Sequence, residues 1–147
     1  MNKVFAIYVI GIIFFSGCVS ENPEEKRIKT VIAKYNIAVI EAYKNQYFDY
    51  LKESADEKEF RKIYVITIGF LQGNRILESE LLSLAFKEIK IEDSVATVKT
   101  SEDWSYRWVD YRTREEVEPL KDLHYEMIYH LVKKDGRWLV EKAEEVK

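Results

Sequence analysis

The spacing of the hydrophobic residues changes once along this chain of 147 residues, and no other feature of the sequence limits the fold more. Up to about residue 86, hydrophobic residues recur with a period near 3.6, which is the period of one face of a helix. From about residue 88 they alternate with polar residues, as in a strand with one buried face. Helices followed by strands predict an α+β fold, in which a helical layer packs on an antiparallel sheet.

The first helix is predicted to begin near Asn22-Pro23. Asparagine suits the N-cap, proline suits the first helical position, and Glu25 is placed to complete a capping box. The hydrophobic positions keep the helical period as far as about Lys52. We therefore expect one long N-terminal helix with a single stripe that faces a core.

Two further helices are expected before the strands. Ser54 and Glu57 form a second capping-box pattern ahead of another helical stripe, although the β-branched run at residues 65–68 leaves a strand open there. Gly73-Asn74 ends this segment. The third helix is predicted over residues 76–86, with one face made of Leu77, Leu81 and Leu84.

Strands are predicted over residues 88–90, 95–99, 104–111 and 123–134, and a last strand follows the Asp135-Gly136 turn. Asp-Gly favours a two-residue hairpin because both central positions take a positive φ. That turn sets a register, with Lys133 opposite Trp138, Leu131 opposite Val140 and His130 opposite Glu141. The segments together predict a curved antiparallel sheet of about four strands, packed on about three N-terminal helices.

The order of elements over residues 24–147 resembles the nuclear-transport-factor-2-like (NTF2-like, or cystatin-like) superfamily. The resemblance implies a cone-shaped fold, in which a curved sheet wraps a long N-terminal helix. Folds of this kind serve enzymes, binding modules and assembly domains, so the resemblance does not choose among those functions.

Residues 1–17 have the pattern of an export signal. Lys3 precedes an apolar run over residues 4–15, and small residues follow at 16 and 17. The run is about a dozen residues long, shorter than the roughly 20 that a membrane-spanning helix needs. We expect a signal peptide over 1–17, a short tether over 18–23 and a single domain over 24–147.

Residues 15–18, Phe-Ser-Gly-Cys, resemble the lipobox of prokaryotic lipoprotein precursors. Ser16 and Gly17 fit that pattern, and Phe15 takes the place of its usual leucine. The resemblance implies that the signal is removed and that Cys18 carries a lipid such as palmitate at the start of the mature chain. The domain would then be anchored at the cell membrane, facing outside the cytoplasm. The alternatives are an ordinary signal peptide, or an uncleaved segment with a buried Cys18.

Composition limits the chemistry of the mature domain. The only cysteine is Cys18, so the domain forms no internal disulfide. Removal of residues 1–17 takes away one lysine and no acid, so the formal net charge changes from −3 to −4. A mildly acidic chain is a poor partner for nucleic acid.

The candidate binding residues lie on one predicted strand. Trp104, Tyr106 and Trp108 share a face, because side chains alternate along a strand. These rings either line a concave pocket for an apolar or sugar-like ligand, with Arg107 or Asp110 at its rim, or they fill the core. Complete burial of so much aromatic bulk against tyrosine-rich helices is difficult, and incomplete burial would leave a groove.

The sequence contains no motif for catalysis. His124 and His130 lie on one face of a predicted strand with Glu126 between them, but their Cα atoms would be about 20 Å apart, too far to share a metal ion. We expect both histidines on a polar face, with His130 paired to Glu141. The carboxylates considered for catalysis inside a cone are Asp49, Asp103 and Asp110.

We therefore expect a lipid-anchored domain of the cell envelope that binds a protein partner or a small apolar ligand without catalysing a reaction. We expect no metal ion and no cofactor. One alternative is a small hydrolase or isomerase that uses a carboxylate inside a cone-shaped pocket. Another is assembly through a self-associating sheet, which would give a homodimer.

Overall fold

The computed structural model describes residues 20–147, so the predicted signal peptide and Cys18 lie outside the described residues. Three helices come first: α1 Pro23–Asn45, α2 Asp49–Ser54 and α3 Glu57–Gln72. Four strands follow: β1 Arg75–Glu92, β2 Val95–Asp110, β3 Glu116–Lys134 and β4 Arg137–Glu145. The predicted α+β class is confirmed. None of the described helices is both long enough and apolar enough to cross a membrane.

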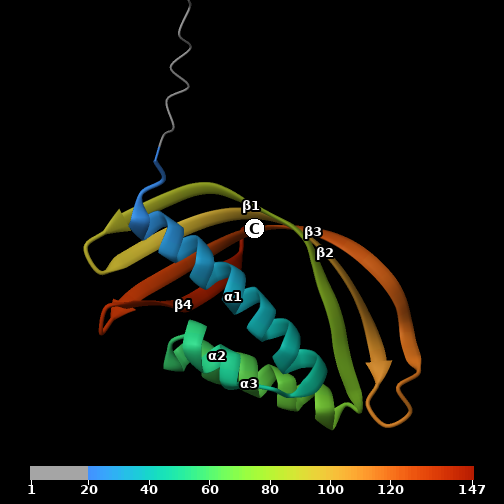
Figure 1. Ribbon diagram of the computed structural model, residues 1–147. Helices are drawn as coiled ribbons and strands as arrows, with labels where there is room; N and C mark the ends of the chain where they lie inside the picture. Colours follow the sequence, from blue (N-terminus) through green and yellow to red (C-terminus); the bar gives the residue numbers. More distant parts are fainter. Residues whose placement is uncertain (1–19) are drawn as a thin grey trace, which may run out of the picture.

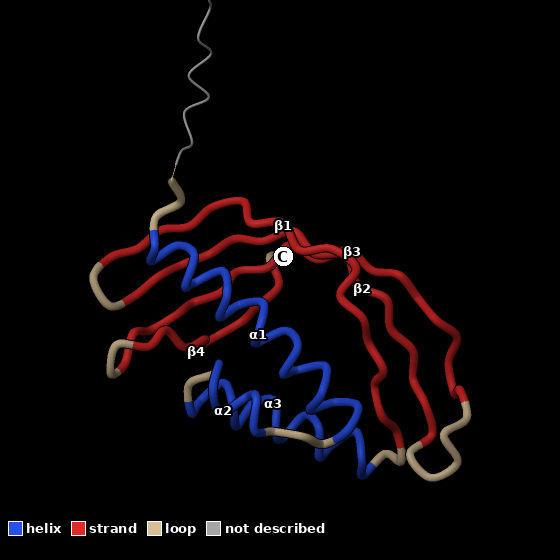
Figure 2. Tube along the Cα trace, in the orientation of Figure 1, coloured by secondary structure: helices blue, strands red, loops and turns tan. Residues whose placement is uncertain are grey.

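The four strands form one antiparallel sheet in the order β1-β2-β3-β4. β1, β2 and β3 run side by side and bend together, as Figure 2 shows. The bent sheet arches over α1, and α2 and α3 lie below α1 on the open side of the arch (Figure 1). β2 is continuous across the two segments that were predicted as separate strands over 95–99 and 104–111. The curved sheet that was expected to wrap the N-terminal helix is present.

α1 fills one part of this arch with a single buried stripe. As predicted, Asn22 caps the helix, and its side chain accepts a hydrogen bond from the backbone N–H of Glu24 at 3.0 Å. The stripe keeps the helical period and contains Ile28, Ile32, Tyr35, Ala38 and Ala42, all at most 4% exposed. It packs in one core with Val98, Tyr129, Leu131 and Val140 of the sheet.

α1 ends at Asn45, and the prediction that it continues to about Lys52 was wrong. Gln46 takes the left-handed conformation with φ of 55°, and its backbone N–H donates to the carbonyl of Ala42 at 3.1 Å. The separate helix α2 then places Leu51 in the core. Leu51 is fully buried, so the hydrophobic positions of α1 and α2 continue one stripe in the sequence. The spacing of hydrophobic residues therefore does not reveal the turn between the two helices.

The start of α3 also differs from the prediction. Ser54 is the last residue of α2, and its hydroxyl donates to the carbonyl of Tyr50 at 3.1 Å. Asp56 takes the N-cap position of α3, but its carboxylate accepts from Lys134 at 2.7 Å instead of from the helix. Residues 65–68 are helical, which confirms the predicted helix there over a strand.

β1 occupies the segment that was predicted as a third helix, so that prediction was wrong. On the inner face of the sheet, the register pairs Leu77 with Trp108, Leu81 with Trp104 and Leu84 with Glu102. Two irregularities of the β-bulge type, between Leu81 and Ser83 and between Phe86 and Glu88, each insert one extra residue. The inward leucines are therefore four and then three residues apart, which imitates the stripe of a helix.

The turn between β3 and β4 confirms the predicted hairpin. Asp135 and Gly136 both have positive φ, of 50° and 74°. The confirmed pairs are Lys133 with Trp138 and Leu131 with Val140. The predicted pairing of His130 with Glu141 is wrong, because a bulge next to His130 shifts the register and brings its ring to Glu144 at 3.2 Å.

Candidate functional site

A cavity of about 490 Å³ lies between the inner face of the sheet and the helices α1 and α3. Its size falls within the range of about 300–1,000 Å³ that is usual for small-ligand pockets. The rings in its wall come from α1, β2 and β3: Tyr35, Tyr43, Trp104, Tyr106, Trp108, Tyr125 and Tyr129. Ile63 and Ile66 of α3 contribute aliphatic surface. A wall of this kind suits a ligand with an apolar body.

The three aromatic residues singled out in the sequence, Trp104, Tyr106 and Trp108, all lie in the wall of this cavity. Each ring is only partly buried, so the three do not form a sealed core. Trp108 also meets Phe70 of α3 edge to face, with 4.8 Å between the ring centroids. The aromatic face of β2 is therefore both the wall of a cavity and a contact with α3.

Arg107 and Asp110 lie elsewhere, and neither lines the cavity. Arg107 follows the strand alternation to the outer face, where it pairs with Glu78 at 2.8 Å. Asp110 holds the turn after β2, because its carboxylate accepts from the backbone N–H groups of Arg112 and Thr113. Neither residue therefore lies at the rim of the cavity, where the sequence analysis placed Arg107 or Asp110.

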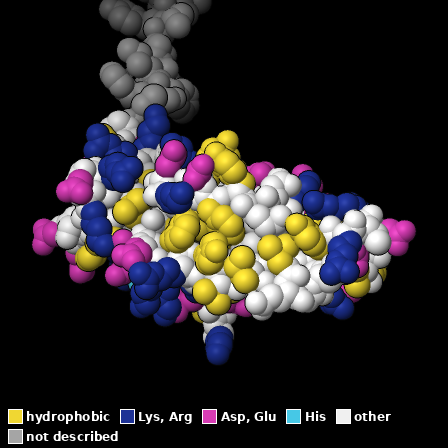
Figure 3. All heavy atoms as spheres, turned by 90° about the horizontal axis from the view of Figure 1, so that it is seen from below, with side chains coloured by type: hydrophobic (Ala, Val, Ile, Leu, Met, Phe, Trp, Pro, Cys, Tyr) yellow, Lys and Arg dark blue, Asp and Glu magenta, His cyan; other side chains and the backbone are white. Residues whose placement is uncertain are grey.

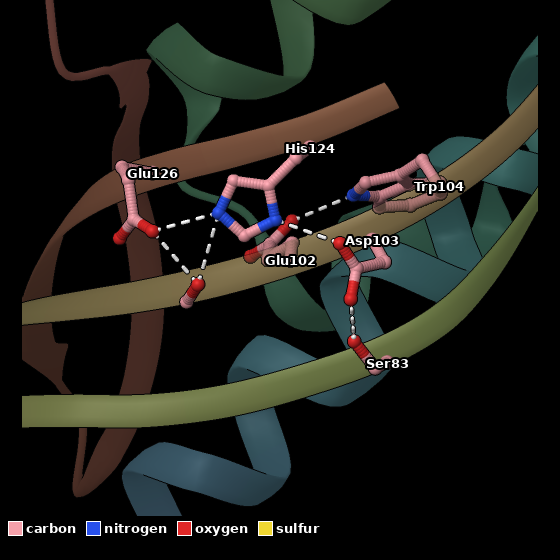
Figure 4. Close-up of polar contacts among 7 residues, drawn as sticks. Ser83, Glu102, Asp103, Trp104, His124 and Glu126 are labelled. Atoms are coloured by element: carbon pink, nitrogen blue, oxygen red, sulfur yellow. Dashed lines mark hydrogen bonds and ion pairs between the residues drawn. The ribbon is translucent and has the colours of Figure 1, made fainter. Parts of the chain in front are cut away.

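Glu102 places a carboxylate in the cavity wall with only 1% of the residue exposed. Its Oε1 accepts from the hydroxyl of Thr100 at 2.7 Å and from that of Tyr129 at 2.6 Å. Its Oε2 accepts from the indole Nε1 of Trp104 at 2.8 Å, a contact that Figure 4 shows. All three donors are neutral, and no lysine, arginine or histidine of residues 20–147 forms an ion pair with Glu102. The indole N–H can only donate, and the two hydroxyls donate as well when the carboxylate is ionised, a form that only accepts.

Tyr129 connects this carboxylate to α1. Burial raises the pKa of the Tyr129 hydroxyl, and the charge of Glu102 and the hydrogen bond to it raise that pKa further, so Tyr129 stays a neutral donor. The same hydroxyl oxygen lies 3.1 Å from the side-chain oxygen of Asn36. Asn36 is 4% exposed, and its amide nitrogen has no hydrogen-bond partner within the described residues. The polar part of the wall is therefore incompletely satisfied.

Glu59 is a second buried carboxylate, and its environment differs in one respect. It is 2% exposed and accepts a hydrogen bond of 2.5 Å from the hydroxyl of Tyr35. Burial, followed by the charge of Glu59, raises the pKa of Tyr35 well above its ordinary value. Lys62 lies 2.6 Å from the same carboxylate and also donates to the carbonyl of Ala143. Glu59 thus has a cationic partner, whereas Glu102 has none.

Asp103, His124, Glu126 and Ser101 form a polar cluster on the outer face of the sheet (Figure 4). The Nδ1 of His124 lies 2.7 Å from Asp103, and its Nε2 lies 2.8 Å from Glu126 and 3.2 Å from the hydroxyl of Ser101. Hydrogen bonding to Asp103 and then to Glu126 raises the pKa of His124. A carboxylate at each ring nitrogen favours the doubly protonated ring, and in that form His124 has no free nitrogen to accept a proton from Ser101.

The sequence analysis missed the carboxylate inside the cavity. The three aspartates that it considered, Asp49, Asp103 and Asp110, all lie outside the cavity wall. One signal was available, because Glu102 stands two residues before Trp104 and so shares the aromatic face. Asn36 and Tyr129 reach this site from other elements, and strand alternation within β2 carries no information about them. Within residues 20–147, no group of His, Cys, Asp or Glu is arranged to hold a metal ion.

Exposed hydrophobic side chains form a second notable surface. On α2 and α3, Tyr50 is 49% exposed, Tyr64 45% and Val65 66%. Figure 3 views the molecule from the side on which these helices lie, and hydrophobic side chains gather along the middle of that face between charged ends. Surfaces of this kind are typical of protein contacts.

Comparison with known proteins extends the description of the fold. No protein-family model matches the sequence, and no curated protein matches it. Among solved structures, the intermembrane space region of chloroplast protein ARC6 superposes with a TM-score of 0.73 at 14% identity, covering 82% of this chain and 95% of that one. A conserved protein from Planctomyces limnophilus DSM 3776 superposes with a TM-score of 0.56 at 16% identity, covering 84% and 98%. At these identities the likeness shows a shared fold and nothing about activity.

An NTF-2-like protein of unknown function from Shewanella oneidensis MR-1 is a weaker match. Its TM-score is 0.48 at 12% identity, covering 82% of this chain and 99% of that one. A likeness at this TM-score does not assign the chain to a superfamily.

The outer cluster predicts a pH dependence. We expect an NMR titration of the ring protons to give His124 a pKa above 6.5, and the variants Asp103→Asn and Glu126→Gln to lower it. A pKa raised by folding stabilises the native state below the unfolded value of about 6.5, and this contribution is lost as the pH rises through the folded value. The stability difference between wild type and His124→Gln should therefore shrink from pH 6 to pH 8. A wild-type pKa at or below 6.5 would contradict the described cluster.

Proposed function

We propose that this protein is a lipid-anchored domain of the cell envelope whose interior cavity binds a small ligand with an apolar body. The observation that carries the proposal is the aromatic face of β2, where Trp104, Tyr106 and Trp108 line a cavity of about 490 Å³. Stacked and edge-on rings supply apolar contact, and the few polar groups in the wall would orient the ligand. The domain would bind its ligand without catalysing a reaction.

The anchor is the second part of the proposal. It rests on the lipobox-like residues 15–18 and on the position of α1, which begins at Pro23. A lipid on Cys18 would leave only four residues before the helix, too few for a long stalk. The domain would then lie close to the membrane surface.

Two other functions considered from the sequence have some support. A hydrolase or isomerase would need a carboxylate inside the cone, and Glu102 is one. Its oxygens, however, already accept three hydrogen bonds, which leaves about one of four lone-pair positions for a substrate proton. Assembly was expected through a self-associating sheet, whereas the exposed side chains of α2 and α3 offer a different surface to a protein partner or a second copy of the chain. Sedimentation at micromolar concentration would reveal a homodimer.

The anchor predicts a clear difference between two proteins. The full-length chain and its Cys18→Ala variant are expressed in a host that processes lipoproteins, and their intact masses and membrane fractionation are compared. We expect wild type to carry acyl mass and to fractionate with the membrane, and the variant to lack the acyl mass. An unmodified thiol in wild type would overturn the anchor and leave the cavity proposal standing.

The cavity predicts binding of a neutral apolar probe. We would use the mature chain from residue 18 with Cys18→Ser, and follow the fluorescence of N-phenyl-1-naphthylamine on titration. Trp108→Ala removes a ring from the wall, and Ser79→Phe adds one inside it, so each variant should weaken binding at least tenfold. Tyr111→Ala is the control, because Tyr111 is 41% exposed and lies outside the wall. Equal binding by all four proteins, or no binding by any, would overturn the proposal.

A further inference from the structure

We infer that the ligand of the cavity is an organic cation: a protonated amine with N–H groups, carried on an apolar body. The inference rests on the proposed function, because it names the chemical class of the ligand in the same cavity. It comes from the charges and the free hydrogen-bonding positions of the wall, and not from the aromatic rings alone.

The charged groups around the cavity are unbalanced. The wall contains the side chains of Lys62, Glu102 and Glu145. Lys62 is already paired with Glu59 at 2.6 Å and donates to a backbone carbonyl, so its charge is matched by an acid of its own. No other cationic side chain of the described residues lines the wall beside Glu102 or Glu145. The side chains of the wall therefore leave a net negative charge, which opposes an anionic ligand and favours a cation.

The position of Glu102 makes this imbalance costly. A carboxylate that is 1% exposed is removed from water, and its three neutral donors replace only part of its hydration. Glu59 is buried to a similar extent, but it has Lys62 as a counterion. The chain thus supplies a counterion for Glu59 and none for Glu102. A cationic ligand would supply the counterion of Glu102.

The free hydrogen-bonding positions are acceptors. A carboxylate accepts about four hydrogen bonds, and Glu102 receives two on Oε1 and one on Oε2, so Oε2 has room for another donor. The hydroxyl of Tyr129 has a single proton, and the contact of 2.6 Å gives that proton to Glu102. The contact of 3.1 Å between Tyr129 and Asn36 is then satisfied when the amide of Asn36 is turned to donate.

In the orientation described, the amide nitrogen of Asn36 has no hydrogen-bond partner. When the amide is turned, the nitrogen donates to Tyr129, and the side-chain oxygen becomes the atom without a partner. Asn36 is 4% exposed and lies in the cavity wall. Asn36 and Glu102 both contact the hydroxyl of Tyr129, so the two side chains lie in one polar cluster. An ammonium group has an N–H donor for the unused position on Oε2 of Glu102, together with the positive charge that the wall lacks.

The aromatic rings complete the site for such a group. The indole of Trp104 is held beside the carboxylate by its own hydrogen bond to Glu102. The faces of tryptophan and tyrosine rings attract cations, most strongly where water is excluded. Trp108 and Tyr106 lie further along the same strand and would cover the apolar body of the ligand. A neutral polyol could use the acceptors but would not balance the charge.

Three naphthalene compounds of nearly equal size separate these possibilities. 1-Naphthylmethylamine is a cation at neutral pH, 1-naphthalenemethanol is neutral and 1-naphthoic acid is an anion. Each competes with N-phenyl-1-naphthylamine for the mature chain carrying Cys18→Ser. We expect the amine to bind at least tenfold more tightly than the alcohol, and the acid to bind more weakly than the alcohol.

The Glu102→Gln variant removes the charge and keeps the size of the side chain. We expect it to lose at least tenfold in affinity for the amine and to change its affinity for the alcohol by less than about threefold. Glu126→Gln is the matched control, since Glu126 lies on the outer face and should leave the preference unchanged. Circular dichroism checks that both variants fold.

The outcomes distinguish failure of the proposed function from failure of the inferred cation preference. If alcohol and amine displace the probe equally well, the cavity binds apolar molecules and the inference of a cation is wrong. If the probe itself does not bind, the proposed function fails first. The comparison of the three compounds on wild type needs no variant, so a Glu102→Gln protein that did not fold would still leave the inference open to refutation.

Discussion

The inner face of β2 is longer than the surface that α1 covers, and the cavity follows from this mismatch. The inward side chains Ala96, Val98, Thr100 and Glu102 are at most 4% exposed. Beyond them, Trp104, Tyr106 and Trp108 are only partly buried and line the cavity. The bent sheet and α3 close the space, with Phe70 against Trp108. The domain therefore combines a packed core at one end with a hollow at the other, and the aromatic rings that could not be fully buried form the wall of the hollow.

Glu102 lies at the border between these two parts. Tyr129 joins it to the core, because its ring packs edge to face on Tyr35, with 6.0 Å between the centroids, and its hydroxyl reaches the carboxylate. Trp104 joins it to the cavity wall. The carboxylate of Glu102 thus orients Tyr129 on the core side and Trp104 on the cavity side. It therefore has a structural role in addition to the proposed role in binding. The contrast with Glu59, which has its own lysine, is the reason we connect Glu102 to a ligand.

Much of the fold could be predicted from the spacing of residues. The stripe of α1 and the Asp135-Gly136 hairpin follow from local rules, and the aromatic face of β2 follows from simple alternation. β1 could not be predicted in this way, because its irregularities set inward leucines at helical intervals. Those irregularities depend on pairing with β2, which no local pattern records. The same limit hid the site, since Asn36, Glu102 and Tyr129 meet only through the packing of α1 on the sheet.

The proposed preference for a cation depends most on the negative charge of Glu102. It can be measured as the infrared difference spectrum between the mature chain and its Glu102→Gln variant, both at neutral pH and without ligand. We expect the stretching bands of an ionised carboxylate in the difference spectrum. The carbonyl band of a protonated carboxyl group would contradict it, because the cavity wall would then lack the unbalanced negative charge at Glu102 that calls for a cation.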